Sequence, residues 1–288
     1  MGATGWALVS AFFGGLGVVL QQKGTLEAPP AGDDSAGFVA AILRKPVWLA
    51  GGACQFGCWA CQGIALTKGP LALVQPVISL QIVIALPLGV AITNQVVGRR
   101  EWLGAILVVA GVAVFVAAAN TSTGRESAPA NVWLAVSGIV VALTALAAVV
   151  GSRRRPATKA ALYGAAAGIL FGYQAAVMNV FVSVAPDGLG PILASWSTYA
   201  LIVSALGGFY LLQTALQVGA LAPAIATSNA AAPITSVVLG RVVFLENPQR
   251  TTGGKLVSAA SAALLLVGLV LLARGEAAQS GSRASETT

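Results

Sequence analysis

The chain has 288 residues, of which 57% are hydrophobic and only 9% are charged, and its formal net charge is +7. A soluble domain carries about a quarter charged residues, so this composition, with a mean hydropathy of +0.85, excludes a soluble globular protein. The apolar residues form long runs, and about 20 apolar residues are what a helix needs to cross the core of a bilayer. The sequence therefore predicts an all-α, polytopic membrane helical bundle.

Apolar runs divide the chain into about nine predicted transmembrane helices. Helices are expected because lipid offers no partner for open backbone groups, and because the runs are too long and continuous for barrel strands. In chain order the runs cover residues 3–21, 46–66, 71–92, 102–118, 132–150, 160–184, 192–213, 218–240 and 253–273. Only a few residues separate the seventh run from the eighth, so these two could also form one long bent region.

The distribution of Lys and Arg predicts the orientation in the membrane. With the N-terminus outside, eleven of the 16 basic residues fall on the cytoplasmic side and five fall outside. The short cluster Arg153–Arg155 contributes most to this bias, as the positive-inside rule requires. We therefore expect a multi-pass protein of the cytoplasmic (inner) membrane with its C-terminus inside. The scattered basic residues indicate contact with lipid head groups rather than with nucleic acid.

The segments between and after the runs suggest the domain limits. Residues 24–45 are expected to be a loop, in which 38–43 could lie as a short helix in the membrane interface. Residues 275–288 are rich in Ser, Gly, Ala and charge and are expected to be disordered. The predicted division is a first transmembrane repeat at 1–120, a linker and connecting helix at 121–159, a second repeat at 160–274 and a cytoplasmic tail at 275–288.

The evidence for a repeat is that two segments of the chain have similar sequences. Residues 65–76 read ALTKGPLALVQP and residues 215–226 read ALQVGALAPAIA, an offset of 150 residues. The same offset pairs Gly104 with Gly254 and Ala110 with Ala260. Four helices, a connecting fifth helix and four more helices would place the two copies upside down relative to each other. Inverted repeats of this kind are typical of secondary transporters, with the substrate near the midplane.

Several short motifs also resemble a known family. Lys23-Gly24, Lys45-Pro46-x-Trp48-Leu49 and the segment 69–76 are similar to those of the drug/metabolite transporter superfamily (EamA-like), and most of all its nine-helix NIPA-like branch, described as magnesium transporters. Residues 242–246, VVFLE, resemble the superfamily in ending on a recurring glutamate, here Glu246. The first repeat departs from this pattern, since Thr93-Asn94-Gln95 stands where the acid would be.

The predicted membrane interior contains no Asp, Glu or His in the middle of any run, and the chain has no His. An intramembrane enzyme would need such groups to converge on one site, so we expect no enzyme and no cofactor. Coupling to protons would fall to edge groups such as Lys23, Glu101 and Glu246, or to a Tyr. Magnesium prefers carboxylate oxygens, so a magnesium pathway would have to use backbone carbonyls and amide side chains instead.

Neutral polar residues remain as candidates for a substrate cavity. Pro233 frees the carbonyl of Asn229 and Pro76 frees that of Ala72, and broken helices near the midplane are typical of transporter sites. For any single polar residue, hydrogen bonding between helices is the favoured explanation, and only as a set do these residues suggest a cavity. A packing kink explains each proline as well as a site does. We expect the third and eighth helices to line the cavity, with the sixth facing them. The candidate substrate-binding residues are Gln75, Ser79, Tyr173, Gln174, Ser228 and Asn229.

The spacing of small residues, glycines in the sixth run and cysteines in the second, leads to two further predictions. Gly164, Gly168 and Gly172 repeat at intervals of four and indicate close packing of the sixth helix against another backbone. Cys54, Cys58 and Cys61 share one helical face and are expected to be packing residues, with a soft metal such as Cu(I) as the alternative.

The preferred function is transport of a small organic solute by alternating access. Magnesium transport, movement of a lipid-linked sugar and a non-transporting membrane scaffold are the alternatives. The expected partners are a small-molecule substrate and the lipid bilayer, and a homodimer is left open.

Overall fold

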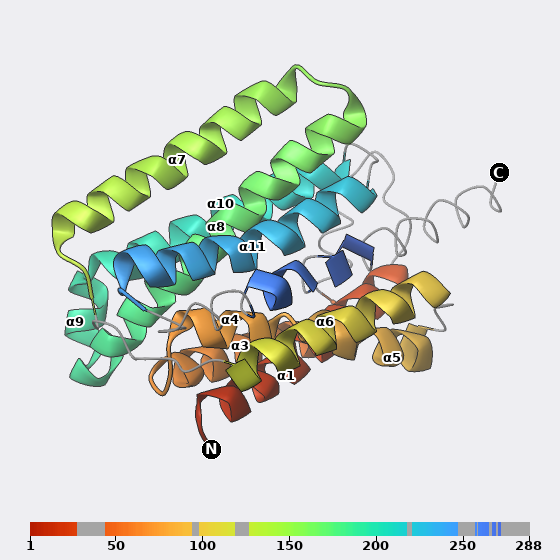
Figure 1. The fold of residues 1–288 in the computed structure, drawn as a ribbon, viewed down its shortest axis with the longest axis horizontal. Helices are drawn as coiled ribbons and strands as arrows, with labels where there is room; N and C mark the ends of the chain where they lie inside the picture. Colours follow the sequence, from red (N-terminus) through yellow and green to blue (C-terminus); the bar gives the residue numbers. More distant parts are fainter. Residues whose placement is uncertain are drawn as a thin grey trace.

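The computed structural model describes residues 1–27, 44–93, 98–118, 127–217 and 221–246, and in the last stretch residues 257, 259–264, 267–268 and 270–271. All regular structure in these residues is helical (Figure 1). The longer helices are α1 (Ala3–Leu26), α3 (Pro46–Leu66), α5 (Gln81–Thr93), α6 (Arg99–Ala118), α7 (Ala130–Ser152), α8 (Pro156–Val184), α10 (Trp196–Gln217) and α11 (Leu221–Val243). The short ones are α4 (Leu71–Ile78), the 3-10 helix η1 (Ala185–Asp187) and α9 (Leu189–Ala194).

The predicted all-α class is confirmed, and among the residues that the structure describes four helical segments are long and apolar enough to cross a membrane. They are Ala3–Gly24, Leu71–Thr93, Ala130–Ser152 and Thr158–Asp187. Helix α7 is the clearest example, because apolar side chains such as Leu134 and Val141 remain exposed on its surface. A helix that is apolar on all sides is stable where lipid, rather than water, surrounds it.

The first eight predicted runs coincide with described helices, with two differences. The third run is divided into α4 and α5, because the chain turns at Ser79 and Leu80, three residues after Pro76. There Leu80 N donates to Val77 O, three residues earlier, and so closes a tighter turn than the four-residue bond of an α-helix. The seventh run begins inside α9, and Ser195, the residue after α9, is extended and separates it from α10. The predicted interface helix at 38–43 and the tail at 275–288 lie outside the described residues.

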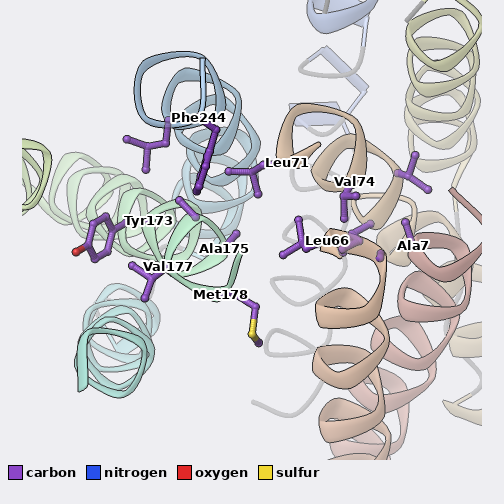
Figure 2. Packing of buried hydrophobic residues seen from close by; sticks show 14 of the residues in the cluster. Ala7, Leu66, Leu71, Val74, Tyr173, Ala175, Val177, Met178 and Phe244 are labelled. Atoms are coloured by element: carbon purple, nitrogen blue, oxygen red, sulfur yellow. The ribbon is translucent and has the colours of Figure 1, made fainter. Parts of the chain in front are cut away.

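The helices form two groups (Figure 1). In the first group α1 packs against α3, α4 and α5, and in the second group α8 packs against α10, α11 and α7. Helix α4 contacts α11 and so joins the groups. In Figure 2, Leu71 of α4 lies beside Phe244, just after α11, and both side chains are fully buried.

Glycines allow α8 and α11 to approach closely, which confirms the packing predicted from the four-residue spacing. A Cβ atom on Gly164 or Gly168 would overlap a carbonyl oxygen of α11, and one on Gly172 would lie 2.6 Å from Ala232 O. In the first group a Cβ atom on Gly15 of α1 would lie 2.7 Å from Gln81 O of α5. Each group therefore has a central helix whose small residues admit the backbone of its neighbour.

Replacing Gly168 by Ala should destabilise the protein, because the added methyl group meets the Ser228 backbone carbonyl. Overpacking of this kind costs about 1–3 kcal/mol. The matched control is Gly138→Ala in α7, where a Cβ atom would meet nothing within 4 Å, and where the helix should gain slightly. Thermal unfolding in detergent would measure both variants. Equal melting temperatures would contradict the close α8–α11 contact.

Candidate functional site

The two helix groups are joined at the N-terminus of α4 by the side chain of Glu246. Leu71 N donates to Glu246 Oε1 at 2.7 Å, and Ala72 N donates to Oε2 at 2.8 Å. The first N–H groups of a helix have no partner within the helix, and Pro70, which precedes α4, provides no side-chain cap. Glu246 supplies that cap from 174 residues away in the sequence. We call this contact between the start of α4 and the segment 240–246 the seam.

The end of α11 is shaped to present this carboxylate. Both Phe244 N and Glu246 N donate to Gly240 O, which folds the chain back on the helix. Leu245 adopts the left-handed conformation (φ 57°) that such a turn requires, at a cost of about 1–2 kcal/mol for a residue with a side chain. A Cβ atom on Gly240 would lie 2.5 Å from Glu246 Oε2, so only glycine leaves room for the carboxylate.

The electrostatics of the seam are those of an anion at a helix N-terminus. The helix dipole and the two N–H donors favour a negative charge there. The Glu246 side chain is only 4% exposed, and none of the described basic residues forms an ion pair with it. Burial raises the pKa of the Glu246 carboxyl above its ordinary value, and the hydrogen bonds from Ala72 and Leu71 partly oppose this shift.

Two of the predicted site residues, Gln75 and Ser79, lie on or just after α4, within about two turns of the seam. Ser79 Oγ donates to Gln75 O, which is a local bond. Gln75 Nε2 is buried and has no hydrogen-bond partner among the described residues. A buried amide donor without a partner is costly, so Gln75 has unused capacity to bind an acceptor.

Two others, Ser228 and Asn229, lie on α11 further from the seam. Ser228 is buried, and its carbonyl oxygen packs against Gly168 of α8. Asn229 is partly buried. Asn229 is 11 residues before Gly240, or about 16 Å along the helix axis at 1.5 Å per residue. The direct bonds of the seam therefore involve the other end of α11.

Tyr173 does not face α4 and α11 as expected. Its hydroxyl is 2.7 Å from Ser137 Oγ of α7, and its ring packs edge-on against Trp133 at the start of α7. Figure 2 shows the Tyr173 side chain pointing away from Leu71. The apolar ring makes this contact with the neighbouring helix, a preference that the sequence pattern of α8 alone does not reveal. Gln174, the next residue, is partly buried on α8.

Two features of this region were not predicted. The first is the role of Gly240, which no local motif of the sequence indicates. The second is a cluster of rings around the buried Trp133, formed by Tyr173, Trp196 and Phe244. Trp133 Nε1 is also buried without a partner among the described residues. Glu246 itself was singled out through the family resemblance and as an ionisable group at a helix end, but its role as a cap of α4 was not predicted.

The described residues offer no evident metal centre. Among them no group of three His, Cys, Asp or Glu side chains lies close enough to hold an ion. The three cysteines are free thiols. Ser10 Oγ of α1 donates to the backbone carbonyl of Cys58 at 2.9 Å and lies 3.3 Å from its sulfur. Cys58 thus contributes to the packing of α1 against α3.

Comparison with known proteins places this chain beside one full-length relative. The chain is 26% identical over 279 residues to an uncharacterized protein of Corynebacterium glutamicum, and the alignment covers 96% of both chains. No protein-family model and no solved structure matches the chain. The similarity thus extends over almost the whole helical architecture rather than over one segment.

Replacing Glu246 by Ala should destabilise the protein by about 2–3 kcal/mol, because it leaves two buried N–H donors without partners. Glu246→Gln keeps one acceptor oxygen and should cost less. Asp187→Ala is the control, since this carboxylate is exposed and its removal should change stability by about 0.5 kcal/mol or less. Chemical unfolding in detergent measures the three variants, and an equal stability of Glu246→Ala and Asp187→Ala would show that the seam contributes nothing.

Proposed function

We propose that this protein is a secondary transporter of the drug/metabolite (EamA-like) type that moves a small organic solute across the cytoplasmic membrane by alternating access. The observation that carries the proposal is the matched packing of the two helix groups. In the first group α1 contacts both α3 and α5, and in the second group α8 contacts both α10 and α11. The order of the contacting helices along the chain is the same in both groups.

The directions in which the helices run are consistent with inverted repeats. The short connection Arg153–Arg155 reverses the chain between α7 and α8. If α4 and α5 together form one crossing and each crossing reverses the chain, five reversals separate α1 from α8, and these two helices run in opposite directions in Figure 1. With the helical residues between 257 and 271 as a last crossing, the proposed count is nine spans, with the N-terminus outside and the C-terminus in the cytoplasm.

The seam is suited to act as one gate of such a transporter. It joins the repeats where the start of α4 meets the end of α11, through a carboxylate that accepts two hydrogen bonds. Opening this end would break these two bonds and the buried contact of Leu71 with Phe244, without disturbing the glycine contacts inside either group. Only a limited number of interactions would then have to change between the two states, which must be similar in free energy.

The chemistry of the interior favours a neutral or weakly charged solute. Gln75, with its unpartnered amide donor, and the partly buried Asn229 are uncharged. Magnesium would call for carboxylate oxygens, and both oxygens of Glu246 already accept backbone N–H groups. A small organic molecule with acceptor groups is therefore preferred to magnesium as the substrate.

Cysteine labelling tests the transport proposal. In a background in which Cys54, Cys58 and Cys61 are replaced by Ala, Ser79→Cys and Asn229→Cys should each react with a membrane-impermeant maleimide. Reaction is expected from the outside of intact cells and also in inside-out vesicles, because the cavity would open to each side in turn.

Val141→Cys is the matched control, because Val141 is 63% exposed on α7 and should face lipid. It should not react from either side. A membrane scaffold without a water-filled cavity would leave Ser79→Cys and Asn229→Cys as unreactive as this control, and that result would overturn the proposal.

A further inference from the structure

A groove of about 410 Å³ lies between α7 and α11, with Ile169 of α8 among its lining residues. This volume is within the range of ligand pockets in proteins. Thr235 is the only polar residue of its lining. The remaining lining residues are Val136, Ile139, Val140, Leu143, Ala231, Ile234, Val238, Leu239 and Val242. Such a surface can bind only an apolar group.

The groove is open along its outer edge. Ile139 of α7 is 58% exposed, and Val238 of α11 is 52% exposed. The α7 wall belongs to the segment Ala130–Ser152, which is apolar enough to span a membrane. The open edge therefore lies where lipid acyl chains surround the protein.

The length of the groove matches one leaflet of a bilayer. Its α11 wall extends from Ala231 to Val242, and 11 residues at 1.5 Å each span about 16 Å. Half of a hydrocarbon core of about 30 Å is about 15 Å. One end of the groove is near the start of α7, where Trp133 packs against Trp196, and aromatic residues are typical of the membrane interface.

A basic side chain is present at that same end. Arg241 is exposed on the last turn of α11, directly before Val242 and three residues after Val238. It forms no ion pair with a described residue. An arginine at the interface beside an apolar groove is complementary to a lipid with a phosphate head group.

We propose that the groove between α7 and α11 binds one acyl chain of an anionic phospholipid, whose phosphate pairs with Arg241. The lipid belongs to the leaflet on the Arg241 side. It holds α7 beside α11, because its chain contacts both helices where they do not reach each other. The proposal depends on insertion in a membrane and not on transport.

Native mass spectrometry tests this binding. The full-length protein is released from nanodiscs that contain phosphatidylglycerol or phosphatidylcholine, and the number of retained lipids is counted. Wild type should retain one phosphatidylglycerol. Arg241→Gln should weaken retention about fivefold, the equivalent of the roughly 1 kcal/mol that one basic residue contributes near an anionic surface. Arg154→Gln, at the opposite end of α7, should retain the lipid like wild type.

Variants that fill the groove test the binding of the acyl chain separately from the binding of the phosphate by Arg241. Ile139→Trp and Val238→Trp enlarge opposite walls and should each abolish retention of phosphatidylglycerol, while Val141→Trp, on the outer face of α7, should not. A thermal unfolding curve for each variant shows that it is folded. Unchanged retention of phosphatidylglycerol in both groove variants would overturn the proposal. A second contradicting result would be a wild-type dimer that carries no lipid and that Ile139→Trp converts to monomers, because a second copy of the chain would then occupy the groove.

Discussion

The arrangement of this bundle depends on the pairing of one buried carboxylate with two backbone N–H groups. Helix α4 starts after a proline, so the donors of Leu71 and Ala72 need an acceptor from elsewhere in the fold. Glu246 supplies both bonds from the end of α11, at 2.7 Å and 2.8 Å. Gly240 makes room for the carboxylate and Leu245 takes a strained backbone conformation to aim it. Strain of this kind persists where the surrounding structure compensates for it.

Within each helix group a different force dominates. In a bilayer, helices gain little from the hydrophobic effect against one another and depend on close packing. Gly168 against Ser228 O and Gly15 against Gln81 O provide such contacts inside the groups. The groups are thus held internally by contact between backbones, and they are held to each other by the hydrogen bonds of the seam together with buried apolar contacts such as that of Leu71 with Phe244. Hydrogen bonds to a charged group can be exchanged for water, whereas tight backbone packing cannot change without a large rearrangement. In the proposed transport cycle, this difference would allow the two groups to move relative to each other.

The sequence predicted the features that depend on composition and on local spacing. The apolar runs located the helices, because membrane crossing requires length and hydrophobicity, and the spacing of Gly164, Gly168 and Gly172 located the tight face of α8. The orientation of Tyr173 toward α7 was not predictable, because periodicity does not identify the neighbour of a face. The same limit applies to the partner of Glu246, since a capping bond between residues 174 positions apart leaves no local signal. Pro76 predicted a break in the third run, but not that the helix would end three residues later, at Ser79, because that position depends on how the chain turns.

Hydrogen–deuterium exchange at the backbone amides of Leu71 and Ala72 measures the seam most directly. If Glu246 caps α4, these amides should exchange slowly in the wild type and at least about tenfold faster in Glu246→Ala, since tenfold corresponds to the loss of about 1.4 kcal/mol of protection. The amides of α8 that pack against α11 should keep their wild-type rates. Exchange at Leu71 and Ala72 that is as fast in the wild type as in the variant would contradict the seam.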